Sequence, residues 1–308
     1  MYIEGFCMKK IILIFLLCFG LNAKTITSND VYSEVAFITD EIHYLLKYYG
    51  VKHDHDGITK RTTISTKLKP RNVWQITYEI MVKINILRQQ YKLPVIEPIN
   101  MAPVLHLNPD LVYEQTQRIQ TELKIFFIRQ GVKIPTIKRK SYKGKTPLDI
   151  FIGLSHISAA FDEINSERFT PSYVFGEQMR VYNDITLILQ YLHIDDKTIP
   201  KKKNKDATII NIFNGSIKIL EKIKQLQILA GIEFVDFHEF EKEGHTVGGI
   251  YTITQMILAE LQTIKAYIGI DLITPASIRY NTKTPAEVEQ LVSWNIRKIA
   301  SINSLVKR

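Results

Sequence analysis

Residues 146–151 read Thr146-Pro147-Leu148-Asp149-Ile150-Phe151, and residues 284–288 repeat the pattern as Thr284-Pro285-Ala286-Glu287-Val288. Both stretches predict the start of an α-helix. Threonine before the first helical residue accepts a hydrogen bond from a free backbone N–H, and proline suits the first helical position. The acidic residue three positions after the threonine completes a capping box and favours the positive end of the helix dipole. We therefore expect a structural role for these threonine, proline and acidic residues.

The same pattern occurs eight times in the chain, in more degenerate forms. Its anchor is the branched apolar residue four positions after the cap, and the eight anchors are Val31, Val73, Val112, Ile150, Val174, Ile212, Ile250 and Val288. Successive anchors are separated by 42, 39, 38, 24, 38, 38 and 38 residues. A spacing held this closely indicates tandem repeats.

Each anchor is followed by apolar residues at helical spacing. Positions 7, 11 and 14 after the anchor are apolar in seven repeats, and only Asn295 in the eighth interrupts the row. These positions share one face of a helix, so each repeat predicts one amphipathic helix of about six turns. The position directly after the anchor is aromatic in seven repeats, which is typical of rings that close the end of a bundle and less often of a ligand platform. These residues are Tyr32, Trp74, Tyr113, Phe151, Phe175, Phe213 and Tyr251.

The connectors are long and partly apolar. The segment from Gly231 to His245 has 15 residues, whereas about 2–8 residues commonly join the helices of a bundle. The segment 94–104 contains Val95, Ile99 and Val104. We expect these connectors to run extended along the helices, with their apolar residues in the grooves between them.

Six repeats end on a shared signal at positions 19 and 20 after the anchor. A glycine past a helix end supplies a left-handed turn, and the next apolar residue packs back on the last turn. The six endings are Gly50-Val51, Lys92-Leu93, Gly131-Val132, His193-Ile194, Gly231-Ile232 and Gly269-Ile270. Repeats four and eight lack the ending. The chain is thus predicted to be all-α, with two four-helix units at residues 24–166 and 167–308 and a reversal of direction at residues 165–169.

Residues 1–23 resemble a secretory signal peptide in their order of charged, apolar and small residues. Translation starting at Met8 would place Lys9 and Lys10 directly before the apolar run 11–19, although a start at Met1 is equally compatible with the sequence. The run is too short to cross a bilayer as a helix, at about 1.5 Å per residue against about 30 Å of hydrocarbon. We expect cleavage after Ala23, a periplasmic or secreted protein, and no membrane span after the signal is removed.

Charge and cysteine content restrict the partners. The chain carries a formal net charge of +9, which predicts weak attraction to anionic surfaces of the envelope rather than to nucleic acid. The two cysteines, Cys7 and Cys18, both precede the proposed cleavage site. The mature protein would therefore contain no disulfide and no thiol ligand.

Position 10 after the anchor alternates between acidic and basic residues, apart from Ala160 in the fourth repeat. The charged residues are Glu41, Lys83, Glu122, Asp184, Lys222, Glu260 and Lys298. One interpretation is a solvated face. The other is ion pairing between neighbouring helices, which would help to set their order.

No catalytic or cofactor motif is evident. Weak metal candidates occur at His53, Asp54, His55 and Asp56, but a metal site needs further ligands fixed by a rigid element, so a solvated loop is the better interpretation. The sequence predicts an exported helical-repeat protein that binds or scaffolds a protein partner in the envelope, without catalytic activity or cofactor. A periplasmic sensor module for a small molecule or metal is the alternative.

Overall fold

The protein was analysed as a computed structural model, which describes residues 25–52, 68–133, 136–235 and 245–306. The predicted signal peptide and His53, Asp54, His55 and Asp56 lie outside these residues. The described residues form eight α-helices and one short 3-10 helix, with no strand. The helices are α2 (Ser28–Tyr49), α4 (Pro70–Gln90), α5 (Pro109–Arg129), α6 (Pro147–Asn165), α7 (Pro171–Tyr191), α8 (Ile209–Leu229), α9 (Val247–Tyr267) and α10 (Pro285–Val306). The prediction of an all-α fold with one helix per repeat is confirmed.

The core consists of the apolar faces that the repeat predicts. All eight anchors are at most 4% exposed, and the apolar residues 7, 11 and 14 positions later are buried as well. Asn295 replaces an apolar residue in this row and is also fully buried. Its amide donates to the backbone carbonyl and the side-chain oxygen of Gln178, at 3.1 Å in both cases. These hydrogen bonds offset the cost of burying the amide NH2 group, while its Oδ1 accepts no hydrogen bond from a described residue.

The helix ends follow the predicted signal. The residue at position 19 has a positive φ in all six repeats that carry it, including Lys92 and His193, which both have φ 54°. The next N–H then donates to the carbonyl five residues earlier, as from Val51 to Leu46 at 2.9 Å. This hydrogen bond closes the last turn and satisfies a carbonyl that has no partner within the helix.

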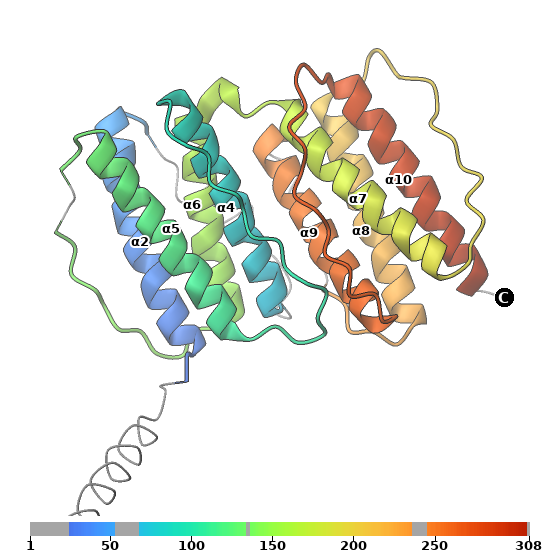
Figure 1. The fold of residues 1–308 in the computed structure, drawn as a ribbon, viewed down its shortest axis with the longest axis horizontal. Coiled ribbons are helices and arrows are strands. Elements are labelled where there is room, and N and C mark those ends of the chain that lie inside the picture. Colours follow the sequence, from blue (N-terminus) through green and yellow to red (C-terminus); the bar gives the residue numbers. More distant parts are fainter. Residues whose placement is uncertain (1–24, 53–67, 134–135, 236–244, 307–308) are drawn as a thin grey trace, which may run out of the picture.

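The helices are arranged as two four-helix units with the same contacts (Figure 1). In unit 1, α2 and α4 each contact α5 and α6; in unit 2, α7 and α8 each contact α9 and α10. The first and second helices of a unit therefore both pack on its third and fourth. Whether residues 24–166 and 167–308 fold independently stays a prediction.

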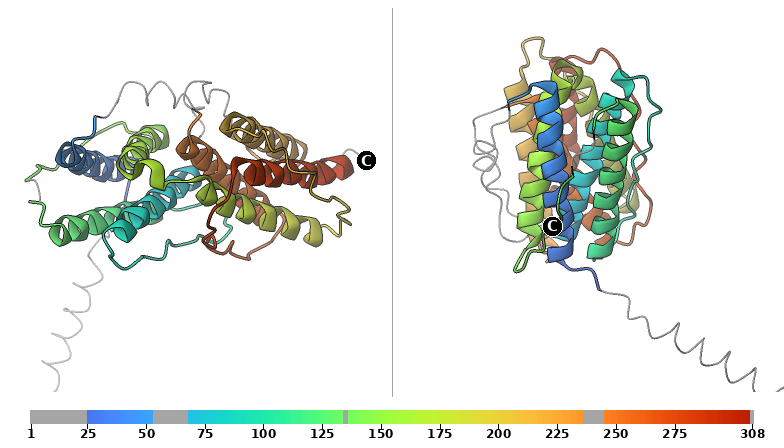
Figure 2. Two further views of the ribbon diagram at one scale, coloured as in Figure 1. Left: turned by 90° about the horizontal axis from the view of Figure 1, so that it is seen from above. Right: turned by 90° about the vertical axis from the view of Figure 1, so that its left-hand side faces the viewer.

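The four helices of each unit run in the same direction. The backbone N–H of Lys145 donates to Asn29 at 2.8 Å, and that of Lys283 donates to Ser172 at 2.9 Å, so the first and fourth helices start side by side in both units. Connectors therefore return along the bundle, as Figures 1 and 2 show for residues 91–108 and 268–284. The chain reverses between α6 and α7, as predicted, and unit 2 runs opposite to unit 1.

The connector between α4 and α5 lies only partly in the groove expected for it. Ile96 and Met101 pack against the core, but Val95 is 56% and Ile99 49% exposed. The expectation that its apolar residues avoid water is wrong for Val95, Ile99 and Val104. An extended chain points successive side chains to opposite sides, and only one side of this segment faces the bundle.

Candidate functional site

The two units meet where α4 packs against α9, an interface that we call the seam. These are the second helix of unit 1 and the third helix of unit 2, and they run antiparallel. Both are buried around nearly their whole circumference. Because almost no side of α4 or α9 faces solvent, these two helices bury polar residues of their own, whereas other helices expose theirs.

At one end of the seam, buried amides and one carboxylate connect α4 to α9. The amide of Asn72 donates to Glu260 Oε1 at 2.8 Å, and Gln227 donates to its Oε2 at 2.7 Å. Further along, Gln75 donates to Gln255 at 2.6 Å. Burial raises the pKa of Glu260, while the two amide donors act in the opposite direction. These hydrogen bonds fix the register of the helices, because a slipped register would leave buried polar groups unpaired.

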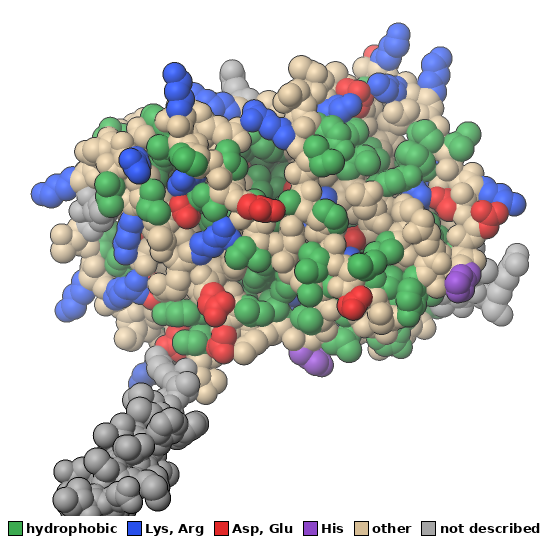
Figure 3. Space-filling view, in the orientation of Figure 1, with side chains coloured by type: hydrophobic (Ala, Val, Ile, Leu, Met, Phe, Trp, Pro, Cys, Tyr) green, Lys and Arg blue, Asp and Glu red, His purple; other side chains and the backbone are tan. Residues whose placement is uncertain are grey.

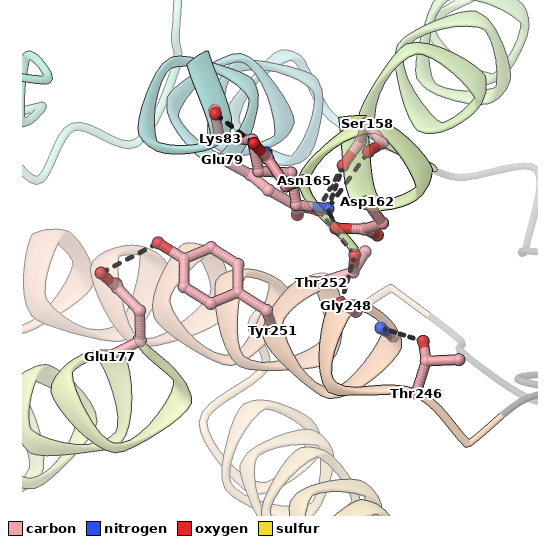
Figure 4. Close-up of polar contacts among 11 residues, drawn as sticks. Glu79, Lys83, Ser158, Asp162, Asn165, Glu177, Thr246, Gly248, Tyr251 and Thr252 are labelled. Atoms are coloured by element: carbon pink, nitrogen blue, oxygen red, sulfur yellow. Dashed lines mark hydrogen bonds and ion pairs between the residues drawn. The ribbon is translucent and has the colours of Figure 1, made fainter. Parts of the chain in front are cut away.

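A denser network lies at the other end of the seam, where α9 begins (Figure 4). The ammonium of Lys83 is fully buried, donates to Glu79 Oε1 at 2.8 Å and Ser158 Oγ at 2.7 Å, and forms an ion pair with Asp162 Oδ1 at 2.7 Å. Thr252 of α9 donates to Glu79 at 2.9 Å. Burial alone would lower the pKa of Lys83, but Asp162 and Glu79 outweigh it and raise that pKa. The ammonium therefore stays charged within a network that joins α4, α6 and α9.

A glycine brings unit 2 close to this network. A Cβ atom on Gly248 would lie 2.1 Å from Asp162 Oδ2, which is far below van der Waals contact. Any larger residue at position 248 would displace the carboxylate that binds Lys83. The approach of α9 to α6 thus depends on this glycine.

The Ser158–Lys83 contact is not arranged for nucleophilic catalysis. An activated serine requires a neighbouring base that can take its proton. Here the lysine is protonated and already donates to two carboxylates, while Ser158 donates to Glu79 and is only 3% exposed. This arrangement favours a structural role for both residues.

A cavity of about 150 Å³ opens beside the seam, and we call it the seam pocket. Its deepest charged group is Glu177 of α7, which is 1% exposed. Tyr251 donates to Glu177 Oε1 at 3.1 Å, and Arg180 donates to Oε2 at 2.6 Å. Arg180 also donates to Asn100 of the connector at 2.9 Å, so the pocket floor is tied to one of its walls.

Both units and two connectors contribute to the pocket walls. One wall is a face of α4 and the other is the start of α7, while residues 95–98 and 276–280 of the connectors form the mouth. The lining residues are Tyr78, Val82, Asn85, Ile86, Gln89, Val95, Pro98, Ser172, Tyr173, Glu177, Tyr251, Ala276, Ser277, Ile278, Arg279 and Tyr280. The pocket is complete only when the two units are docked.

Comparisons of the chain with protein-family models, with curated proteins and with solved structures found no match. None of the described helices combines the length and the apolar character that crossing a membrane requires. The site must therefore be interpreted from its own geometry.

A second cavity, of about 330 Å³, lies between α2 and α6 in unit 1. Thr39, Asp40 and His43 line it from α2, and Gly153 and His156 line it from α6. Within the described part of the chain, no group of three histidine, cysteine or acidic residues is placed to hold a metal ion. We call this cavity the unit 1 groove.

The charged residues at position 10 are mostly buried and have partners other than one another. Lys83 bonds as described above, Glu122 pairs with Arg88, Asp184 with Lys265, and Lys298 with Asp196. Glu260 accepts from two amides, Glu41 accepts no hydrogen bond from a described residue, and the carbonyl of Lys222 accepts one from Asn303 at 3.5 Å. Ion pairs such as Glu122–Arg88 and Asp184–Lys265 do join neighbouring helices. Among the described residues, however, no ion pair joins two of the seven charged residues at position 10.

The predicted caps lie at the starts of α6 and α10. The N–H of Thr146 donates to Asp149 at 2.8 Å, and that of Thr284 donates to Glu287 at 3.0 Å. Pro147 and Pro285 are the first helical residues. Among the aromatic residues after the anchors, Tyr251 lines the seam pocket, and Tyr32 lines the unit 1 groove.

Sequence reasoning missed most of the seam. It did not identify Glu79, Ser158, Asp162, Glu177 or Gly248. The sequence does contain one signal for the seam, a row of polar residues on α4 at Asn72, Gln75 and Glu79. Their spacing of three and four residues places them on one helix face. Such a row on a helix that is also apolar elsewhere predicts contact with a polar partner helix.

Proposed function

We propose that the protein is an exported, non-catalytic binding or scaffolding protein of the cell envelope that acts through a protein partner. The signal-like residues 1–23 support export. The buried Ser158–Lys83 contact, in which the ammonium pairs with two carboxylates, favours a structural role over catalysis. The proposal concerns the face of the molecule on which the two connectors cross the seam.

The observation that carries the proposal is the apolar surface of these connectors. Leu272, Ile273 and Ile278 are 58%, 51% and 72% exposed, and Val95 on the other connector is 56% exposed. Figure 3 views this face and shows apolar side chains gathered over it. Contiguous exposed apolar surface beside a pocket is typical of a protein-binding site.

The test uses two isoleucines of equal exposure. Ile278 lies on the seam face and Ile199 on the connector between α7 and α8, and both are 72% exposed. Immobilised Ile278→Asp protein should lose a partner captured from envelope extract, whereas Ile199→Asp protein should retain it. Equal capture by both variants would contradict binding at the seam face.

A sensor for a small molecule is the second candidate, because the unit 1 groove has a volume of about 330 Å³ and Asp40, His43 and His156 line it together with apolar residues. Native mass spectrometry of the purified protein distinguishes the two functions. A bound molecule of constant mass favours the sensor, and its loss in a Thr39→Trp variant would place it in this groove, which Thr39 lines.

A further inference from the structure

We propose that the seam pocket receives the side chain of a tyrosine from an extended segment of the protein partner. This inference rests on the proposed function and specifies the chemistry that the seam face recognises. It depends on the size of the pocket, its walls, its floor and its mouth.

The size of the pocket matches one aromatic ring. Its volume is about 150 Å³, and a protein cavity of roughly this volume holds a benzene molecule. An indole or a larger ligand would have to displace the walls. Those walls are held by buried residues such as Tyr78 and Tyr251, which are 3% and 1% exposed.

The walls favour an aromatic occupant. Val82 and Ile86 present aliphatic surface from α4, and Tyr78 and Tyr173 present rings. Aromatic rings pack favourably against other rings in edge-to-face or offset geometry. The guanidinium of Arg180 already lies 4.7 Å from the Tyr78 ring centroid, so this ring is fixed before any ligand enters.

The floor selects a neutral hydrogen-bond donor. Each oxygen of Glu177 accepts one hydrogen bond, from Tyr251 and Arg180 respectively, and a carboxylate oxygen can accept a second. The charge of Glu177 is balanced by Arg180 at 2.6 Å. A buried ammonium would therefore lack a counter-charge, whereas a phenol hydroxyl pays no such penalty. Phenylalanine cannot make this additional hydrogen bond to Glu177.

The mouth indicates that the ring belongs to a polypeptide. Val95 and Ile278 line the pocket and are also 56% and 72% exposed. A free phenol would leave this apolar rim in water, but residues flanking a bound tyrosine would cover it. Both rim residues lie on extended connectors, alongside which an extended partner segment can pack.

The proposal is tested on the purified full chain with defined probes followed by NMR titration. The probes are N-acetyl-tyrosinamide, N-acetyl-phenylalaninamide, phenol, and an acetylated, amidated pentapeptide with a central tyrosine between valines. N-acetyl-tyrosinamide should bind about tenfold more tightly than its phenylalanine counterpart, because only the hydroxyl can donate an additional hydrogen bond to Glu177. The pentapeptide should bind more tightly still. Equal binding of the tyrosine and phenylalanine probes would overturn the inference, and so would phenol binding as tightly as the pentapeptide.

A pocket-filling variant locates the site. Ala276 lines the pocket and is half-buried on a connector, so Ala276→Trp fills the mouth without touching Glu177. This variant should weaken pentapeptide binding at least tenfold, while Ile199→Trp should not, and circular dichroism should show both to be folded. Unchanged binding by Ala276→Trp would overturn the location. If the probes fail to bind but partner capture still depends on Ile278, the tyrosine inference fails and the proposed function stands.

Discussion

The two units differ most sharply at one position that their repeats share. Glu41 on α2 and Asp184 on α7 both lie ten residues after the anchor of the first helix of a unit, and both are buried. Asp184 accepts from Lys265 at 2.9 Å and from Thr274 at 2.7 and 2.8 Å. Neither oxygen of Glu41 accepts a hydrogen bond from a described residue. The repeat thus retains a buried acid in both units but a counter-ion in only one.

The reason is visible in the third helix of each unit. The position of Lys265 in unit 2 corresponds to Phe127 in unit 1, 138 residues earlier, and Phe127 is fully buried. Unit 1 therefore has a ring where unit 2 has an ammonium. Burial raises the pKa of Glu41 to about 7, with Lys124 acting weakly in the opposite direction. A common helical framework can thus contain two electrostatically different cores.

The unit 1 groove provides a second contrast. Its residues Thr39 and His156 correspond to Tyr182 and Trp294 in unit 2, at offsets of 143 and 138 residues. These two rings lie 4.7 Å apart, and the Trp294 indole donates to Thr198 Oγ1 at 3.0 Å. Aromatic side chains therefore occupy in unit 2 the region that corresponds to the cavity in unit 1.

The largest effect should come from removing the counter-ion in unit 2. Lys265→Met leaves Asp184 buried without its cation and should lower the free energy of unfolding at pH 7 by about 3–5 kcal/mol. Urea denaturation followed by circular dichroism measures the change. The double variant Asp184→Asn/Lys265→Met should recover most of the loss. A loss below about 1 kcal/mol for the single variant would mean that the Asp184–Lys265 ion pair adds little to the stability of unit 2, and that it does not make the core of unit 2 different from that of unit 1.

In unit 1, removing the acid should have the opposite sign. The folded pKa of Glu41, about 7, lies above its ordinary value of 4.5. The cost of burying the charged form is therefore absent at low pH, grows as the pH rises from 4.5 to about 7, and is fully present above the folded pKa. Glu41→Gln should be more stable than the native protein by up to about 3 kcal/mol at pH 8 and nearly equal to it at pH 4.5.

Paired denaturation curves at pH 8 and pH 4.5 check this prediction, with Asp184→Asn as the matched control. The control should destabilise at pH 8, because it removes the partner of Lys265. A Glu41→Gln protein that is less stable than the native one at pH 8 would contradict the contrast between the two acids.

A smaller effect is expected at the aromatic pair. Trp294→His introduces the residue that unit 1 has at the corresponding position and removes most of the contact with Tyr182. It should lower stability by about 2 kcal/mol, less than a fully buried tryptophan would lose, because Trp294 is half-buried. Thermal denaturation measures the loss. Tyr182→Phe keeps the ring and should change stability by under about 0.5 kcal/mol; a larger loss there would assign the stabilisation to the hydroxyl.

The repeat predicted the helices well because it records local requirements. Anchors such as Val31 must be buried whatever the neighbouring helix is, and Lys92 occupies the same helix-end position as Gly50 and takes the same left-handed turn. The pair of Lys83 with Glu79 has the local spacing of four residues that a helical sequence can predict, but the second partner of Lys83 could not be predicted. Asp162 lies on another helix, and the register between helices is not part of a periodic pattern.

The candidate site was beyond sequence reasoning for a related physical reason. Glu177 on α7 and Tyr251 on α9 are 74 residues apart and meet because these two helices of unit 2 pack against each other. The seam also breaks the equivalence of the units, since it joins a second helix to a third. A duplication detected in the sequence suggests that the two units have equivalent surfaces. The close approach of Gly248 in unit 2 to Asp162 in unit 1 shows instead that the units dock through surfaces that do not correspond.

The smallest effects test what the units have in common. Thr146 and Thr284 start the fourth helix of each unit, and each makes the same hydrogen bond to the acidic residue three positions later. The hydrogen bonds from Thr284 and the contacts of Lys203 and Lys283 lower the pKa of Glu287 to about 2, and the pKa of Asp149 is also lowered, first by its hydrogen bond with Thr146. These carboxylates therefore contribute stability above their ordinary pKa, and the contribution is lost as the pH falls through the folded value.

Thr146→Ala and Thr284→Ala should each lower the free energy of unfolding by about 1 kcal/mol at pH 7. The two losses should agree within about 0.3 kcal/mol and should add in the double variant, because the caps are in different units and share no partner. The loss at Thr284 should shrink as the pH falls toward about 2, the folded pKa of Glu287. A loss at only one threonine would show that the units differ even at the helix start that defines the repeat, and that their shared sequence pattern does not imply shared energetics.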